Sequence, residues 1–216
     1  MSLNILFEDN HIIVVEKPAN IPSQEDKTGD LDMLTLIKEY LKEKYNKHGN
    51  VYLGLVHRLD RPTAGIMVFA KTSKAASRLS EEIRNNRLIK KYRAIVKGEI
   101  DSSGIMEDYL KKNQRLNKSF VTNSKDKLGK LAKLEYKKIR YNQETNTSLV
   151  DINLITGRHH QIRVQFLERG HPVYADSKYD KPYKNQNLKL YAYYLSFKHP
   201  TKDEILEFEY IPEEYN

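Results

Sequence analysis

The sequence predicts a protein of the α+β class. Many short segments alternate apolar and polar residues with a period of two, which is typical of strands that bury one face. Only a few segments repeat their apolar residues at the spacing of a helix, and the strand-like segments look antiparallel. One large domain or two small ones fit a chain of 216 residues.

The first strand-like segment is residues 5–18, where the pattern predicts two short strands joined at Asn10. In chain order, the others are 51–56, 66–70, 91–100, 132–141, 147–156, 190–200 and 205–210. Within 91–100, alternation places Tyr92, Ala94 and Val96 on one face. Segments 132–141 and 147–156 follow each other closely, so we expect them to pair.

Three segments are expected to be helical: residues 31–45, a segment that begins at Ser73, and 157–170, which ends at Gly170. Asp30 is the expected N-cap of the first. The expected apolar faces are Leu34, Ile37, Leu41 and Tyr45 in the first helix and Ala76, Leu79 and Ile83 in the second.

Composition excludes several classes of protein. The chain has no cysteine, so disulfides, thiolate metal sites and cysteine nucleophiles are excluded. No apolar run reaches 18 residues and the N-terminus lacks a signal-peptide pattern, so we expect no membrane span and a cytoplasmic location.

The formal net charge is +8, from 37 Lys and Arg against 29 Asp and Glu. A basic chain favours polyanions, so RNA or DNA is the expected partner, although a Lys-rich proteome would give the same charge without one. Residues 101–130 are polar and Lys-rich, and they form either a mobile, RNA-facing insertion or surface hairpins. Surface hairpins are favoured.

A cluster of ionisable residues lies between two apolar segments in "GLVHRLDRPTAGIMVFAK", residues 54–71. His57, Arg58, Asp60 and Arg61 fall in one turn. An aspartate beside proline is usually a turn residue, and the arginines alone would be a solvated surface. Between apolar strands, the combination indicates one carboxylate kept ionised among cations, as a nucleophile or general base requires.

A second cluster is "TGRHHQIRVQF", residues 156–166. Thr156 or Gly157 is expected to open the helix, whose free N–H groups would form a phosphate cradle with Arg158. Arg163 would then lie one turn beyond His159 on the same face. The histidines could equally be helix surface, and no carboxylate stands at metal-ligand spacing from them, so no metal site is predicted.

Five segments occur in the order of the motifs of one enzyme family. They are "VVEKPANIP", "HRLDRPTAGIMVFAKT", "IKKYRAIVKG", "TGRHHQIRVQFLERGHPVYAD" and "KLYAYYLSFKHP". On these motifs the chain resembles the pseudouridine synthases of the ribosomal large-subunit synthase A family, which isomerise uridine in rRNA and tRNA. Departures from the motifs occur at Ala64, Gln165, Asp180 and Tyr191.

The resemblance implies one catalytic domain over residues 1–216, with a mixed, mostly antiparallel curved β-sheet, flanking helices and no separate N-terminal RNA-binding domain. It also implies RNA as the partner, either rRNA or tRNA or both. A monomer is expected.

The resemblance also assigns residues. Asp60 is the essential catalytic carboxylate, and whether it attacks the sugar, attacks the base or removes a sugar proton stays open. Tyr92 is expected to stack on the flipped uracil, although alternation alone would make it a core residue. Arg163 is expected to pair with Asp60, and Arg58 to fill the space that the flipped base leaves. The further substrate-binding candidates are His57, Arg61, Arg158 and Leu190.

Making pseudouridine breaks the C1′–N1 bond and joins C1′ to C5 without oxidation or loss of a group, so no cofactor or metal is expected. Two other classes stay open. A nucleic-acid-binding module without catalysis would explain the charge equally well. A nucleoside hydrolase should need a second carboxylate or a metal, because it must deliver water.

Overall fold

The computed structural model describes residues 3–183 and 186–216. The chain divides into two compact units, each with its own core. The first unit contains residues 1–88 and 192–210, and the second contains 89–191 and 211–216. The expectation of one catalytic domain over 1–216 stays a prediction.

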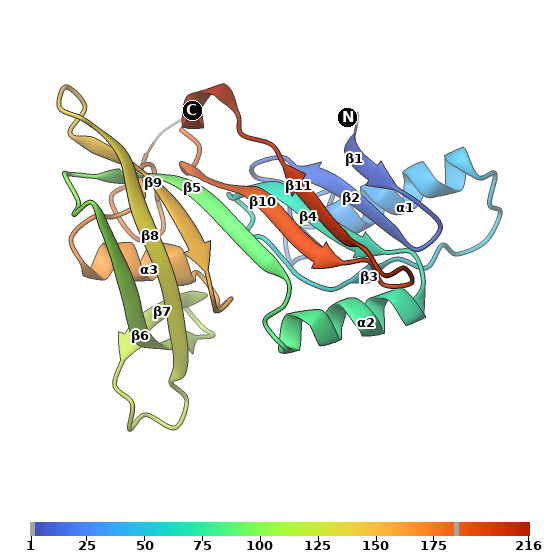
Figure 1. Cartoon of the computed structure of the whole chain (residues 1–216), viewed down its shortest axis with the longest axis horizontal. Coiled ribbons are helices and arrows are strands. Elements are labelled where there is room, and N and C mark those ends of the chain that lie inside the picture. Colours follow the sequence, from blue (N-terminus) through green and yellow to red (C-terminus); the bar gives the residue numbers. More distant parts are fainter. Residues whose placement is uncertain (1–2, 184–185) are drawn as a thin grey trace. The chain divides into compact units, whose positions relative to one another are not determined.

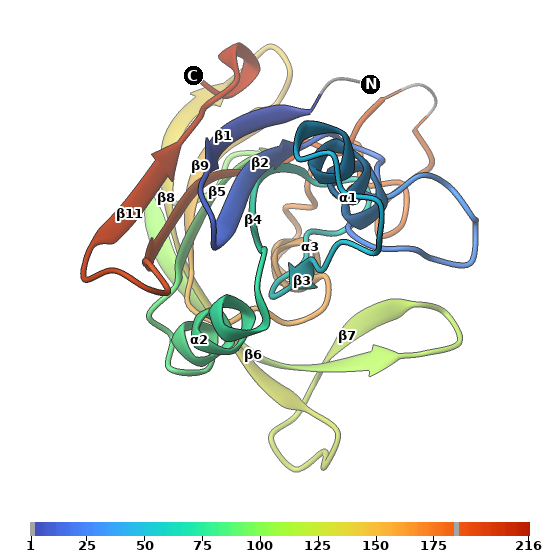
Figure 2. The same ribbon diagram turned by 90° about the vertical axis from the view of Figure 1, so that its right-hand side faces the viewer.

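The first unit is a sheet with two helices (Figures 1 and 2). Its strands are β1 (Asn4–Glu8), β2 (Ile12–Lys17), β3 (Gly54–Leu55), β4 (Ala64–Ala70), β10 (Leu190–Lys198) and β11 (Ile205–Glu209). The first two residues of β10 belong to the second unit. They lie in the order β1–β2–β4–β10, with β3 on β4 and β11 on β10. The pairs β1–β2, β2–β4, β3–β4 and β10–β11 are antiparallel, as expected.

Both faces of β2 and β4 are covered, which explains why their sequences are apolar runs rather than alternating ones. On one face, Ile12 and Val68 belong to a core that includes Leu79 of helix α2 (Ser73–Arg84). Ile13 and Phe69 have the opposite parity and are also fully buried. The expected helix that begins at Ser73 is confirmed.

Helix α1 (Met33–Lys44) confirms the first expected helix but not its cap or its full apolar face. The N-cap is Asp32, whose Oδ1 accepts from the N–H groups of Leu34 at 2.9 Å and Thr35 at 3.3 Å. Asp30 is instead exposed and forms an ion pair with Arg61. The buried residues are Met33, Leu36, Ile37 and Leu41, whereas Leu34 is half-buried and Tyr45 exposed.

The second unit is an antiparallel sheet in the order β5–β9–β8–β6–β7 (Figure 1). Its elements are β5 (Ile89–Lys97), β6 (Ser103–Asn113), β7 (Lys118–Thr122), β8 (Lys130–Asn142), β9 (Thr147–Leu154), α3 (Gln161–Glu168) and the short 3-10 helix η1 (Glu213–Tyr215). Helix α3 covers one sheet face, with Phe166 5.6 Å from the Tyr136 ring and Val164 in a cluster with Leu110 and Ala132.

The Lys-rich segment 101–130 contains a hairpin of β6 and β7, as the sequence predicts. Strands β6 and β7 pair in antiparallel fashion, with Tyr109 opposite Thr122 at one end and Asn113 opposite Lys118 at the other. The expected pairing of the next two strands, β8 and β9, is also confirmed. These pairings confirm the α+β class and its mostly antiparallel character.

Candidate active site

Asp60 lies in the turn that joins β3 to β4, and the loop after β2 holds this turn. The Thr63 N–H closes the turn by donating to the Asp60 carbonyl over 3.0 Å. From the loop, the Ser23 hydroxyl donates to the Leu59 carbonyl over 2.9 Å and accepts from the Leu59 N–H over 3.2 Å. The side chain of Asp60 is half-buried. A carboxylate is thus presented from a fixed backbone rather than from a loose loop.

Lys17, at the end of β2, ties the same turn and loop together. Its side chain is fully buried, and its Nζ donates to the carbonyls of Pro18 at 2.9 Å, Ile21 at 2.7 Å and Arg61 at 3.0 Å. Three acceptors match the three N–H groups of an ammonium. Burial lowers the pKa of Lys17 to about 7, although the negative charge of Asp60 opposes that shift. Lys17 lies in the motif "VVEKPANIP", but it was not predicted as a site residue, because a lysine that ends an apolar run gives no sign that its side chain is buried.

The other ionisable residues of the turn have separate surroundings. His57 is buried, and its Nε2 accepts from the Val68 N–H over 3.1 Å. Arg58 is exposed. The guanidinium of Arg61 contacts the carboxylate of Asp30. Substrate contacts by His57, Arg58 and Arg61 stay predictions, and the structure gives His57 a packing role as well.

Gly65, directly after this turn, allows the close approach of β10. Its φ is +132°, and a Cβ atom at this position would lie 2.3 Å from the Ala192 carbonyl oxygen. No L side chain is accommodated there without displacing backbone. The start of β4 and the first part of β10 are therefore in direct contact beside the Asp60 turn.

In the second unit, the alternation expected for β5 is confirmed. Tyr92 is 6% exposed and lies opposite Ile152 of β9, on the same face as Ala94 and Val96. Leu190, the first residue of β10, is also buried. Contact of Tyr92 and Leu190 with a flipped base stays a prediction.

Helix α3 begins later than expected, at Gln161, and ends at Glu168. His160 has a left-handed backbone, with φ at +55°, so the helix does not continue toward its N-terminus. The Gln161 Oε1 accepts from the Thr156 hydroxyl over 2.8 Å and from the Arg158 N–H over 3.0 Å. The side chain of Gln161 therefore fastens the preceding loop.

This geometry contradicts the expected phosphate cradle at residues 156–158. The helix does not open there, and Gln161 already accepts the Arg158 N–H. The Arg158 Nε donates to the Leu131 carbonyl over 2.7 Å. His159 precedes the helix, so His159 and Arg163 do not share a helical face as expected. Substrate binding by Arg158 stays a prediction without the cradle.

Arg163 lies on α3, where all residues from 161 to 166 are buried. Its Nε donates to Asp176 Oδ2 and its Nη2 to Asp176 Oδ1, each over 2.7 Å. Both side chains are at most 3% exposed. Asp176 was not singled out from the sequence. Asp60 belongs to the first unit and Arg163 to the second, and their pairing stays a prediction.

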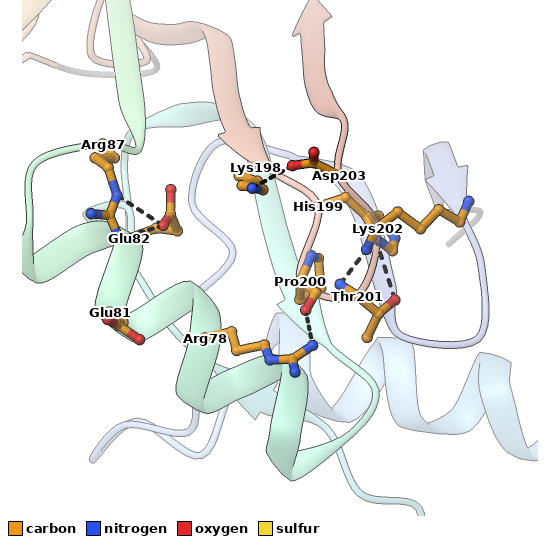
Figure 3. A pocket seen from close by; sticks show the side chains of 10 residues that line it. All are labelled: Arg78, Glu81, Glu82, Arg87, Lys198, His199, Pro200, Thr201, Lys202 and Asp203. Atoms are coloured by element: carbon orange, nitrogen blue, oxygen red, sulfur yellow. Dashed lines mark hydrogen bonds and ion pairs between the residues drawn. The ribbon is translucent and has the colours of Figure 1, made fainter.

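A separate cavity of about 340 Å³ lies in the first unit, between α2 and the β10–β11 turn (Figure 3). Its lining consists of Arg78, Glu81, Glu82, Arg87, Lys198, His199, Pro200, Thr201, Lys202 and Asp203. Arg87 pairs with Glu82, Lys198 with Asp203, and Arg78 donates to the Pro200 carbonyl. These contacts compensate part of the charge in the lining.

Within residues 3–183 and 186–216, no helix is long and apolar enough to cross a membrane. In the same ranges, no three His, Asp or Glu side chains gather where they could hold a metal ion.

Comparison with known proteins agrees with the fold. A human protein, RNA pseudouridylate synthase domain containing 4, superposes with a TM-score of 0.79 at 24% identity, over 98% of this chain and 90% of its own. The fold is therefore that of the pseudouridylate synthases. The family model for RNA pseudouridylate synthase matches residues 11–168, which include the Asp60 turn, Tyr92 and Arg163.

Two curated relatives extend the comparison. One, from Aquifex aeolicus, is described as an uncharacterized RNA pseudouridine synthase and is 33% identical over 96% of this chain and 68% of its own length. The other, ribosomal large subunit pseudouridine synthase D of Nitrosomonas europaea, is 31% identical over 96% of this chain and 61% of its own. This chain belongs to the RNA pseudouridylate synthase family.

Proposed function

We propose that this chain is an RNA pseudouridine synthase, an isomerase that converts specific uridines to pseudouridine with Asp60 as its essential carboxylate. The observation that carries the proposal is the Asp60 turn itself. A half-buried carboxylate stands on a backbone that Ser23 and the buried Lys17 hold in place. All three residues lie within the stretch that matches the family model.

The chemistry asks little else of the protein. The C1′–N1 bond breaks, the uracil turns within the site, and C1′ joins C5; the proton lost from C5 is balanced by the one gained on N1. A single carboxylate suffices because no water is delivered to the sugar. Asp60 attacks the sugar, attacks the base or removes a sugar proton, and each of these steps uses the ionised form.

The remaining residues have supporting roles in this proposal. The target base must leave its stack, and Arg58, exposed on the same turn, is suited to filling the vacated space. Tyr92 stacks on the flipped uracil, and Leu190 lines the base pocket. Arg163 places its positive charge against Asp60, which keeps the carboxylate ionised.

The substrate is RNA, and the +8 charge fits a polyanion. We place the chain in the ribosomal large-subunit synthase A family on its five ordered motifs. The relative named ribosomal large subunit pseudouridine synthase D supports rRNA as one substrate. Action on tRNA and a monomeric state are further parts of the proposal.

The test is incubation of the purified chain with uridine-containing rRNA and tRNA transcripts, followed by digestion and nucleoside analysis. Pseudouridine supports an isomerase, free uracil would indicate a hydrolase, and unchanged uridine with bound RNA would indicate a binding module. Asp60→Asn should abolish pseudouridine formation and leave RNA affinity nearly unchanged, because affinity comes from many phosphate contacts.

The matched control is Asp203→Asn, which removes an exposed carboxylate from the same unit. It should retain the wild-type rate. An Asp60→Asn enzyme with a rate near wild type would show that the carboxylate has been wrongly assigned.

A further inference from the structure

Arg163 is held by more than its ion pair. A buried guanidinium and carboxylate lose their hydration, so the pair persists only where further hydrogen bonds satisfy its members. Asp176 meets that condition. Its Oδ1, besides accepting from Arg163, accepts from the N–H groups of Lys178 at 3.1 Å and Tyr179 at 3.2 Å. One carboxylate thus binds Arg163 and shapes the loop that follows it.

This loop brings an aromatic ring to the guanidinium. The Arg163 Cζ lies 5.1 Å from the centroid of the Tyr179 ring. A desolvated cation–π contact at this distance is attractive and fixes the face of the planar group. Asp176 fixes one edge of the guanidinium and Tyr179 contacts its face, so its orientation is defined in two directions.

The Tyr179 hydroxyl is held in turn by two groups from other elements. It accepts from the Ser119 N–H of β7 over 2.6 Å and contacts the Nδ1 of His160 over 2.7 Å. Burial, and then the positive charge of Arg163, lowers the pKa of His160 to about 2, so this ring is neutral. Its Nδ1 is then able to accept the hydroxyl proton of Tyr179.

We propose that Tyr179 is a positioning residue of the synthase, which acts by fixing the guanidinium of Arg163 together with Asp176. The inference rests on the proposed function, in which Arg163 faces the catalytic carboxylate. A guanidinium that rotates freely would place its charge at varying positions, and a misplaced group lowers the rate strongly. The ring and the hydroxyl of Tyr179 have separable parts: the ring contacts Arg163, and the hydroxyl holds the ring.

Tyr179→Phe and Tyr179→Leu separate these two parts. Single-turnover pseudouridine formation should fall about tenfold in Tyr179→Phe and on the order of a hundredfold in Tyr179→Leu, while RNA affinity stays within about twofold. The matched control is Tyr141→Phe, which removes a hydroxyl that donates to the Asn146 Oδ1 beside the β8–β9 turn. It should keep the wild-type rate. Normal rates in both Tyr179 variants would overturn the proposal.

A double-mutant cycle shows whether Tyr179 acts through Arg163. Arg163→Lys removes the planar group that the ring contacts, so adding Tyr179→Phe to it should cost little more. Fully additive losses would overturn the positioning role. A loss of rate in step with a loss of folded protein, measured by thermal unfolding, would also overturn it.

A second readout does not depend on activity. The Nε–H of Arg163, buried against Asp176, should give a slowly exchanging ¹⁵N NMR signal that Tyr179→Leu speeds up and Tyr141→Phe leaves unchanged. Unaltered exchange in Tyr179→Leu would contradict the inference. If wild type forms no pseudouridine but the exchange changes as expected, the proposed function fails while the contact between Tyr179 and Arg163 stands.

Discussion

The buried side chain of Lys17 stabilises the backbone around the Asp60 turn. Its three acceptors belong to the loop after β2 and to the Asp60 turn, so its removal leaves three carbonyls without their donor. A buried polar group that loses its partner costs about 1–3 kcal/mol. Lys17→Met should therefore destabilise the fold by about 2–5 kcal/mol and lower the rate of isomerisation. Urea unfolding measures the first effect, and exposed Lys42 replaced by Met is the control.

The pKa of Lys17, lowered to about 7 from 10.5, also predicts a pH dependence. Between these values the unfolded chain binds a proton that the folded chain has released. Stability should therefore rise with pH from about 7 toward 10.5, and this contribution is lost as pH falls to 7. Lys17→Met should lack this part of the slope. Parallel stability profiles for wild type and variant between pH 7 and 9.5 would contradict the prediction.

Single residues differ in how well the sequence reveals them. Asp60 is a candidate from the sequence because its ionisable neighbours in the chain form a motif between apolar strands. Lys17 and Asp176 also lie inside motifs, but their roles, like that of Tyr179, depend on tertiary contacts that the motifs do not reveal. The buried Lys17 donates to carbonyls from residues as distant as Arg61. Asp176 forms its ion pair only when the chain folds so that Arg163 of α3 lies next to it.

The ends of helices are the least predictable parts of the elements. The apolar spacing located all three helices, but α3 begins at Gln161 because His160 is left-handed and Gln161 bonds back to the preceding loop. Such side-chain hydrogen bonds replace helical hydrogen bonds at the helix ends, and they leave no periodic pattern in the sequence. For the same reason the cap of α1 was placed two residues early.

The cap of α1 gives a direct test. Asp32→Ala should cost about 1 kcal/mol of stability, because Asp32 accepts from two N–H groups of the first turn. Asp30→Ala removes only an exposed ion pair and should cost less than about 0.5 kcal/mol. Thermal unfolding of both variants compares them directly. A larger loss for Asp30→Ala would contradict the assignment of the cap.

His160, the residue before α3, is expected to make the stability of the protein depend on pH in the acid range. The pKa of His160 is lowered to about 2 from 6.5, mainly by burial and then by the charge of Arg163. Below pH 6.5 the unfolded chain binds a proton at this site and the folded chain does not, so stability should fall as pH decreases. Asn tolerates the left-handed backbone and does not titrate.

His160→Asn should therefore reduce the loss of stability between pH 6.5 and 4. Urea unfolding at pH 7.0, 5.5 and 4.5 measures it, with exposed His48→Asn as the control. If both variants lose stability as steeply as wild type, His160 is not a source of the acid sensitivity.

At the scale of the whole molecule, the fold class was predictable because period-two alternation survives in β5, β8 and β9. The division into two units was not, because the first unit joins residues 192–210 to 1–88 across a hundred residues of intervening chain. No local pattern records which distant strand will lie beside β4.

The +8 charge predicts that RNA affinity falls log-linearly with salt. If the β6–β7 hairpin and the loop after it touch RNA, neutralising three exposed cations there should flatten the slope by about 2 to 3 units. The set is Lys112, Arg115 and Lys127, and the control set is Lys42, Lys47 and Lys74, all changed to Gln. Equal slopes for the two sets would assign the hairpin to bulk solvent.

The assembly of the first unit from two separated stretches has a consequence for biosynthesis. A ribosome makes residues 1–88 first, yet β10 and β11 emerge only after the whole sheet of the second unit has been translated. At elongation rates of roughly 5–20 residues per second, this interval lasts on the order of ten seconds. During that time β4 has β2 along one edge and only the two-residue strand β3 on the other. The close contact between Gly65 and Ala192 can form only when β10 arrives, so until then most of this edge of β4 lacks a partner strand.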